Sequence, residues 1–225
     1  SIKEVAGNSL PSVVTIRAAN SQGTGFFITD EGTLLTNRHV VSGSYNKEIR
    51  LETVSGRSYT GKVSYVSRED DFAIIDVNGV DLPKALPICY SNYPTAGEDV
   101  IALGYPAVGE GLYMPMLTQG VISKTFPDGF FITTAAINAG NSGGPIFDLY
   151  GNLVGIAFAS INKSLEERYG KDPTDLGYAI SSLMLEKVFN YEKIIPVNSK
   201  KYSKVSLYEK MLPSVVVVAV LLNEK

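Results

Sequence analysis

Several residue types are scarce or missing in this chain of 225 residues, and each shortage excludes a class of protein. Cys89 is the only cysteine, so no internal disulfide can form and a cysteine-rich zinc site is excluded. His39 is the only histidine, and a histidine-based metal centre would need carboxylate partners that no local spacing supplies. We therefore expect no metal and no cofactor.

The chain also lacks a basic excess and a long apolar run. Its 20 basic and 23 acidic residues give a net charge of −3, so nucleic acid is not an expected partner. No apolar run reaches the roughly 18 residues of a membrane span. Residues 1–14 lack the basic-then-apolar layout of a signal peptide. Either the protein is intracellular or this chain is already trimmed, and the sequence leaves both open.

The residues that are present indicate a folded β protein. Hydrophobic residues make up 44% and charged residues 19%, as in proteins with a substantial core. Short apolar runs recur with turn residues between them, which predicts an all-β sandwich or barrel. Hairpin tips are expected at residues 30–32 and 150–152. The expected strands are Ser12–Ile16, Gly25–Thr29, Thr33–Thr36, Glu48–Thr53, Lys62–Val66, Phe72–Val77, Asp99–Gly104, Gly120–Ser123, Gly129–Thr134, Pro145–Asp148, Asn152–Ala159 and Gly177–Ile180.

Three segments depart from the strand pattern. Ser181–Tyr191 has apolar residues near helical spacing and predicts the one clear helix, with Ser181 or Ser182 as its N-cap. The Pro-containing stretch Leu82–Pro94 is interpreted as a linker between two β halves. Residues 160–175 are polar and charged, and we expect an exposed loop there.

One short repeat links the two ends of the chain. The pentapeptide LPSVV occurs at residues 10–14 and again at residues 212–216, and both copies begin a β-branched run. The match is either chance in a Val-rich chain or the opening strand of a second, truncated domain of the same kind. The unbroken apolar run Val215–Leu222 would promote aggregation if left bare, so we expect it to be paired or buried.

The stretch NAGNSGGPIFD, residues 138–148, surrounds one serine with residues that resist regular structure. A serine hydroxyl becomes a nucleophile when a base takes its proton, and the resulting oxyanion needs backbone N–H donors nearby. Glycines permit the turn that would aim the amides of Gly140 and Ser142 at that charge. The pattern therefore indicates nucleophilic catalysis at Ser142.

The order of residues along the chain narrows the candidate triads. GNSGG fits the Gly-x-Ser-x-Gly elbow of α/β-hydrolases, but that fold needs a histidine after the serine and none follows Ser142. The acid-His-Ser order would have only Glu4, Asp30 or Glu31 as its acid, and the parallel α/β pattern is missing. The order His, Asp, Ser remains.

His39 and Asp71 are the candidates for that order, and each also has an ordinary structural explanation. His39 follows an apolar strand in LLTNRHVVSG, where a loop could expose it, but a lone histidine is often structural. Asp71 begins DFAIIDV, where a carboxylate on an apolar strand face is costly without a partner. Asp70 and Asp71 could instead be a polar strand end.

Six segments taken together resemble the HtrA/Deg-type trypsin-like serine proteases: GTGFFITDEGTLLTNRHVV, DDFAIIDV, GEDVIALGYP, TQGVISK, AAINAGNSGGPIFDLYGNLVGI and LGYAISS. The resemblance covers about residues 10–190. It implies two antiparallel six-stranded β-barrels of the chymotrypsin type, one over about 10–88 and one over about 95–182. A short helix at about 181–191 would close a protease domain of residues 1–195, and residues 196–225 would form a β-prone tail.

The resemblance also implies roles for individual residues. His39 would be the general base, Asp71 would orient it, and Ser142 would be the nucleophile. Gly140 and Ser142 would supply oxyanion amides, with Asn141 shaping the turn. The expected enzyme is a serine endopeptidase.

The substrate site is expected in two places. The position that sets primary specificity would be Ala136, followed by Ile137, and the absence of a carboxylate there predicts cleavage after small or medium apolar residues. The strand Ala157, Phe158, Ala159 would lie beside the substrate and pair with its backbone. Unfolded polypeptides would be natural substrates, and the resemblance favours an extracytoplasmic location.

Departures from the family pattern keep other interpretations open. AVGEG follows LGYP where an Asn-Pro-Phe-Gly-like run is common, and too few residues follow position 195 for a PDZ domain. The aromatic N-terminal contacts that support trimers are not evident, so a homo-oligomer or pairing through the tail remains an expectation only. The alternatives to a quality-control protease are a latent binding or chaperone-like module, and a protease that processes a partner or its own tail near Val215–Leu222.

Overall fold

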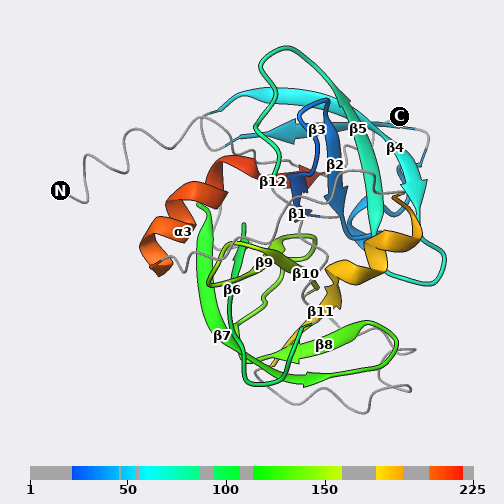
Figure 1. Ribbon diagram of the computed structural model, residues 1–225. Helices are drawn as coiled ribbons and strands as arrows, with labels where there is room; N and C mark the ends of the chain where they lie inside the picture. Colours follow the sequence, from blue (N-terminus) through cyan, green and yellow to red (C-terminus); the bar gives the residue numbers. More distant parts are fainter. Residues whose placement is uncertain are drawn as a thin grey trace.

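Two closed antiparallel β-barrels make up the described part of the protein (Figure 1). The computed structural model describes residues 22–45, 47–53, 56–86, 94–106, 114–158, 176–189 and 203–219. Each barrel has six strands, so the predicted fold class is confirmed. The expected strand Ser12–Ile16 and the expected loop 160–175 lie outside the described residues.

The first barrel has the strand order β1-β12-β3-β4-β5-β2. Its strands are β1 (Gln22–Phe27), β2 (Thr33–Thr36), β3 (Glu48–Glu52), β4 (Ser58–Val66), β5 (Ala73–Asn78) and β12 (Val215–Ala219). The β1–β2 hairpin turns at residues 30–32 as predicted, with Ile28 N donating to Thr33 O at 2.8 Å. Inward-facing Ile49 and Leu51 alternate with exposed or half-exposed neighbours on β3, as a half-buried strand requires.

The second barrel has the order β10-β11-β8-β7-β6-β9. Its strands are β6 (Asp99–Gly104), β7 (Met116–Thr125), β8 (Phe130–Thr133), β9 (Pro145–Asp148), β10 (Leu153–Phe158) and β11 (Gly177–Ser181). The β9–β10 hairpin turns at residues 150–152, where Asp148 N donates to Asn152 O at 3.1 Å. Strands β8 to β11 are buried along their whole length. Their sequences are therefore continuous apolar runs without an alternation of polar residues.

The helical segments correct one prediction. The helix expected at residues 181–191 is a short 3-10 helix, η2 (Ser182–Lys187), although Ser181 does cap it by accepting from Leu183 N. The α-helix of the described residues is instead α3 (Lys204–Met211), which the sequence analysis missed. Its sequence, KVSLYEKM, has no continuous apolar stripe, so the capping Ser203 was the available signal.

The expected tail does not form an appendage. β12 inserts between β1 and β3, pairing antiparallel with both, so residues near the C-terminal end close the barrel that residues near the N-terminal end begin (Figure 1). The expectation that Val215–Leu222 is paired or buried is confirmed for residues 215–219 by this pairing. Two further 3-10 turns, η1 (His39–Val41) and η3 (Leu212–Ser214), follow β2 and precede β12.

Tyr105 lies within a buried apolar cluster that contains side chains from both barrels. Its side chain is fully buried, and that burial raises the pKa of the phenol well above 10, with nearby Tyr208 raising it further. When the pKa of a group is higher in the folded chain than in the unfolded chain, its contribution to the free energy of unfolding is fully present at a pH below the unfolded-state pKa. That contribution is lost as the pH rises toward the folded-state pKa. The buried phenol should therefore make the protein sensitive to alkali.

Tyr105→Phe should reduce that sensitivity. Because only the unfolded chain ionises this phenol easily, the stability difference between variant and wild type should grow by up to about 1.4 kcal/mol per pH unit above 10. Thermal unfolding at pH 8, 10 and 11 measures the difference. Tyr45→Phe, at an exposed tyrosine, is the control and should follow the wild type. A Tyr105→Phe curve parallel to the wild type at all three pH values would contradict the prediction.

Candidate active site

The histidine and the first candidate carboxylate lie against each other in the first barrel. His39 begins η1 directly after β2, and Asp71 lies just before β5, the neighbour of β2. His39 Nδ1 is 2.5 Å from Asp71 Oδ2, and the backbone amide of His39 donates to Asp71 Oδ1 at 3.1 Å. The carboxylate therefore contacts both the ring and the backbone of the histidine, which fixes the ring's orientation.

The two segments are also tied together through the backbone of Asp71. Its carbonyl accepts from Asn37 Nδ2 at 2.8 Å and from Arg38 N at 3.2 Å. Arg38 Nε lies 3.8 Å from Asp71 Oδ1. The Asp71 side chain is 13% exposed and the His39 side chain 41%, so the carboxylate is mostly buried while the ring remains open to solvent.

Asp70 has a different environment from Asp71. Its side chain lies near Ser67, with Oδ2 3.4 Å from Ser67 Oγ, and its amide donates to the same hydroxyl at 3.0 Å. Asp70 therefore stabilises the β4–β5 turn, and Asp71 is the carboxylate that meets the histidine.

The candidate nucleophile lies in a tight turn of the second barrel. Gly140 and Gly143 have φ of +94° and +86°, values that favour glycine, on either side of Asn141 and Ser142. Within the turn Asn141 N donates to Asn138 O and Gly144 N donates to Asn141 O, both at 2.9 Å. Ser142 is 4% exposed. The glycines thus let the backbone reverse around a serine held by the turn's own hydrogen bonds.

Thr24 of β1 joins this turn to the first barrel. Its amide donates to Ser142 O and its hydroxyl donates to Gly140 O, each at 2.7 Å. The same hydroxyl accepts from Tyr105 N at 3.0 Å, and the Thr24 carbonyl accepts from Thr36 Oγ1 at 2.7 Å. One buried threonine therefore holds the serine turn against the strands that carry the histidine.

Close backbone packing brings the serine turn to the residues that flank His39. A Cβ on Gly143 would lie 3.0 Å from Asn37 N. A Cβ on Gly23 would lie 3.0 Å from Ser142 O and 2.5 Å from Val40 Cγ2. Asn37 and Val40 stand on either side of Arg38 and His39, so the structure brings all three candidate triad segments to one junction between the barrels.

The backbone amides around Ser142 differ in their hydrogen-bond acceptors. Asn141 N is bonded within the turn, in keeping with a turn-shaping residue. Gly140 N has no acceptor among the described residues, while Gly143 N donates to Ala157 O at 2.8 Å. The Gly143 amide is therefore not free to bind a ligand.

The residues expected to contact the substrate differ in their exposure and in their hydrogen bonds. Ala136 is exposed and Ile137 is buried just beside it. Ala157 uses its amide and carbonyl on Gly144 and Gly143, each at 2.8 Å, so it has no backbone group left for a substrate. The Phe158 ring packs in the core against Phe130 and Tyr178. Ala159 lies outside the described residues.

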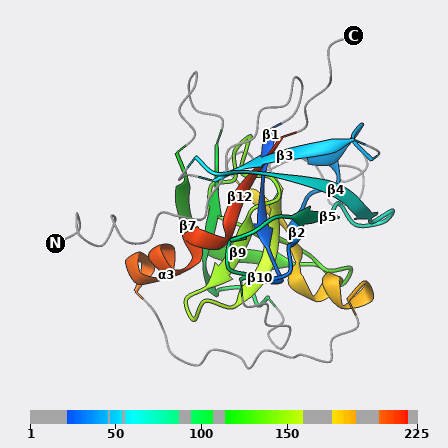
Figure 2. The same cartoon turned by 90° about the horizontal axis from the view of Figure 1, so that it is seen from above.

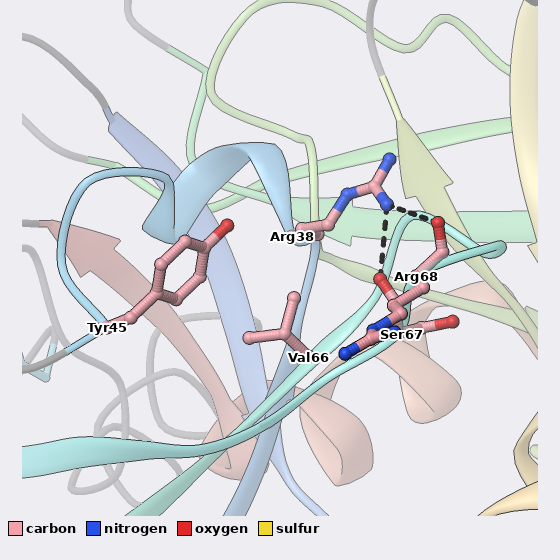
Figure 3. Close-up of a pocket in the computed structure, with 5 residues that line it drawn as sticks. All are labelled: Arg38, Tyr45, Val66, Ser67 and Arg68. Carbon is pink, nitrogen blue, oxygen red and sulfur yellow. Dashed lines mark hydrogen bonds between the residues drawn. The ribbon is translucent and has the colours of Figure 1, made fainter.

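A hollow of about 510 Å³ lies next to Arg38, the residue before His39 (Figure 3). It is lined by Arg38, Tyr45, Val66, Ser67 and Arg68. Arg38 Nη1 donates to the carbonyls of Ser67 and Arg68 at 3.1 and 2.8 Å, which holds the guanidinium across the β4–β5 turn. On this wall the guanidinium of Arg38 lies beside the carboxylate of Asp71.

The described residues form neither a metal-binding cluster nor a membrane-spanning helix. No three His, Cys, Asp or Glu side chains there gather closely enough to hold a metal ion. No helix within the described ranges is long and apolar enough to cross a membrane.

Paired six-stranded barrels, with a His–Asp pair on one and a Gly-Asn-Ser-Gly-Gly turn from the other, define the trypsin-like class of fold. The family model described as "Trypsin-like peptidase domain" matches residues 23–156, and the chain belongs to this family.

Relatives of known annotation and a solved structure agree with that family. The chain is 37% identical over 145 residues to a probable periplasmic serine endoprotease DegP-like of Hahella chejuensis, covering 61% of this chain and 29% of that protein. It is 33% identical over 191 residues to the putative serine protease HhoA of Synechocystis, covering 79% and 44%. The crystal structure of the serine endoprotease from Yersinia pestis matches with a TM-score of 0.64 and 30% identity, over 84% of this chain and 65% of that one. The chain thus spans less than half the length of these two curated relatives.

Three supporting residues were missed by the sequence analysis. Arg38 and Asn37 precede His39 directly, so their position beside the histidine was a usable signal. Thr24 carried no such signal, because its partners lie 81 and 116 residues away along the chain.

Thr24→Val should weaken the serine turn without changing side-chain shape. The substitution leaves Gly140 O and Tyr105 N unpaired in a buried place, which should cost about 1–3 kcal/mol of stability. Chemical denaturation measures that loss, and labelling by a serine-reactive probe should slow as the turn loosens. Thr24→Ser keeps the hydroxyl and should retain most of both. Equal behaviour of the two variants would mean that the hydroxyl does not hold the turn.

Proposed function

We propose that this chain is a serine endopeptidase that cleaves peptide bonds through an acyl-enzyme, with His39, Asp71 and Ser142 as its catalytic triad. The observation that carries the proposal is the seating of the histidine on Asp71, through ring and backbone at once. A purely structural histidine needs no underlying carboxylate, and the close approach of Gly143 to Asn37, two residues before His39, brings the serine turn to the same place. The family and the names of its relatives support the same reaction.

In the proposed first step the proton moves away from the serine. The Asp71 carboxylate accepts from Nδ1–H of His39, so Nε2 is the unprotonated nitrogen of the neutral ring. Nε2 takes the proton of Ser142 Oγ as that oxygen bonds to the substrate carbonyl carbon. His39 then donates this proton to the leaving amine, the C–N bond breaks, and an ester on Ser142 remains.

The second step reverses the proton path with water. His39 removes a proton from a water molecule, whose oxygen attacks the ester carbonyl carbon. The proton returns to Ser142 Oγ as the acid product leaves. In both steps the amide of Gly140, which has no acceptor among the described residues, and the amide of Ser142 would donate to the oxyanion.

A fluorophosphonate probe tests the triad directly. The wild type should be labelled at Ser142, whereas Ser142→Ala should not be labelled at all. His39→Ala and Asp71→Asn should lower the labelling rate by about 10³-fold or more, since the base is lost or held in the wrong tautomer. Mass spectrometry of the labelled peptide measures each case. A folded wild type that remains unlabelled would remove the protease proposal and favour the binding-module alternative.

For specificity, we propose cleavage after small or medium apolar residues. Exposed Ala136 and buried Ile137 would line the pocket for the residue before the cleaved bond, and neither carries a charge. Apolar pockets discriminate modestly, by about 1–3 kcal/mol per methylene. Such residues are accessible in unfolded chains, so unfolded polypeptides are the proposed substrates, and the periplasmic relatives support an extracytoplasmic setting.

Ala136→Asp should redirect this preference. A carboxylate in the pocket would favour Lys or Arg before the cleaved bond, while Val there should become a poorer substrate because a desolvated charge faces an apolar side chain. The change is measured as kcat/KM for otherwise identical peptides that have Val, Ala, Lys or Arg directly before the cleaved bond. We expect the ratio of kcat/KM for Lys to that for Val to rise at least about tenfold. Ala136→Asn is the uncharged control. An unaltered ratio would place the pocket elsewhere.

A further inference from the structure

The slot between β1 and β3 holds a strand from the far end of the chain (Figure 2). β12 pairs with β1 from Gln22↔Ala219 to Phe26↔Val215. On its other side it pairs with β3 from Glu52↔Val217 to Arg50↔Ala219. The strand that closes the barrel therefore begins with the second copy of the repeat, LPSVV at residues 212–216.

The first copy contains the same residues at the positions that are buried in the second. Leu212, Ser214 and Val215 are 4%, 4% and 0% exposed. Their equivalents, residues 10, 12 and 13, are again Leu, Ser and Val. The last residue of the repeat and the two that follow it, residues 14–16, are Val-Thr-Ile, where residues 216–218 are Val-Val-Val, so both copies continue with β-branched residues.

The register of β12 also suits the first copy. Aligning the repeats puts Arg17 in the place of Ala219, and Ala219 lies opposite Gln22. Residues 18–21 would then connect the inserted segment to β1 as an antiparallel hairpin, and loops of this length are common in hairpins. Such a short connection has a small closure entropy, whereas β12 reaches the same place from the opposite end of the chain.

We propose that the slot between β1 and β3 is a strand-binding site with two alternative occupants from one chain, β12 and residues 10–17. The segment 10–17 would take the register that β12 has in this structure and displace it. Strand addition of this kind depends mainly on backbone hydrogen bonds and on alternate side-chain positions, which the two copies share. The proposal does not depend on protease activity.

One cross-strand pair distinguishes the two occupants. Arg50 is exposed on β3 and lies opposite Ala219. In the alternative arrangement it would lie opposite Arg17, and like charges directly opposite each other are destabilising. This repulsion favours β12 and opposes the advantage that residues 10–17 have in their shorter connection to β1.

Engineered disulfides can trap each occupant. In a Cys89→Ser background, Val217→Cys with Glu52→Cys reports β12, because residues 217 and 52 are paired. Thr15→Cys with Glu52→Cys reports the first copy. Directly opposite residues in an antiparallel pair lie about 4.5–5.5 Å apart between Cα atoms, within disulfide range. Under mild oxidation we expect both links to form within single chains. Absence of the 15–52 link, or its presence only in covalent dimers, would overturn the proposal.

The charge at position 17 should control the trapped fraction. Arg17→Glu replaces repulsion at Arg50 with attraction, and the yield of the 15–52 link should rise about two- to fivefold. Arg17→Gln removes the repulsion alone and should give a smaller rise. Equal yields for Arg, Gln and Glu would mean that the link reports random collisions rather than insertion, which would also overturn the proposal.

Deletions provide an independent measurement. Removal of residues 1–19 leaves only β12, removal of residues 212–225 leaves only the first copy, and removal of both leaves the slot without an occupant. Each single deletion should retain a cooperative thermal transition, while the double deletion should lose it. Loss of cooperativity in the 212–225 deletion alone, as complete as in the double deletion, would show that residues 10–17 cannot fill the slot.

Discussion

The hydrogen bonds of Thr24 are the interaction on which the arrangement of the site depends. The candidate triad is divided between two barrels, because His39 and Asp71 belong to the first and Ser142 to the second. Apolar burial holds the barrels together but is not directional. Thr24 supplies direction, since its amide and hydroxyl bond to the serine turn at 2.7 Å from within a strand of the first barrel. In a buried, weakly polar setting such bonds are strong and costly to leave unmade.

Directional hydrogen bonds of Asp71 likewise position the histidine within the first barrel. A carboxylate that only touched the ring of His39 would leave the η1 turn free to shift relative to β5. Here the Asp71 carbonyl also accepts from Asn37 and Arg38, and its side chain accepts from the His39 amide. The histidine is therefore positioned through its backbone as well as its ring, which is how a side chain on a loop acquires the precision that proton transfer requires.

The sequence was informative wherever the controlling interactions are local. Strand alternation, the hairpin tips and the glycines around Ser142 depend on neighbouring residues, so barrel strands and the serine turn could be predicted. The helix expected at residues 181–191 is a shorter 3-10 helix because the apolar residues there pack on β10 and β11, and α3 was missed because its own apolar pattern is weak. The role of Thr24 could not be predicted, because its hydrogen-bond partners are distant in the sequence and meet it only in the folded protein. Choosing between Asp70 and Asp71 likewise needed the fold.

The contrast between the slot and the site explains why the repeat could not be interpreted from sequence. Closing a barrel requires a β-branched strand of the right length and register, and the two copies of the repeat have the same residues at the positions that are buried in β12. Backbone hydrogen bonds do not depend on side-chain identity, so the local sequence pattern gives no preference between the two copies. The serine turn has no such tolerance, because a side chain at Gly143 would collide with Thr24 and Thr36. In our proposal the slot beside β1 tolerates two different strands, whereas the serine turn held by Thr24 of β1 tolerates no such change. In that proposal β1 can hold the serine turn beside either neighbour because its pairing with β2, from Gly25↔Thr36 to Phe27↔Leu34, is the same in both cases.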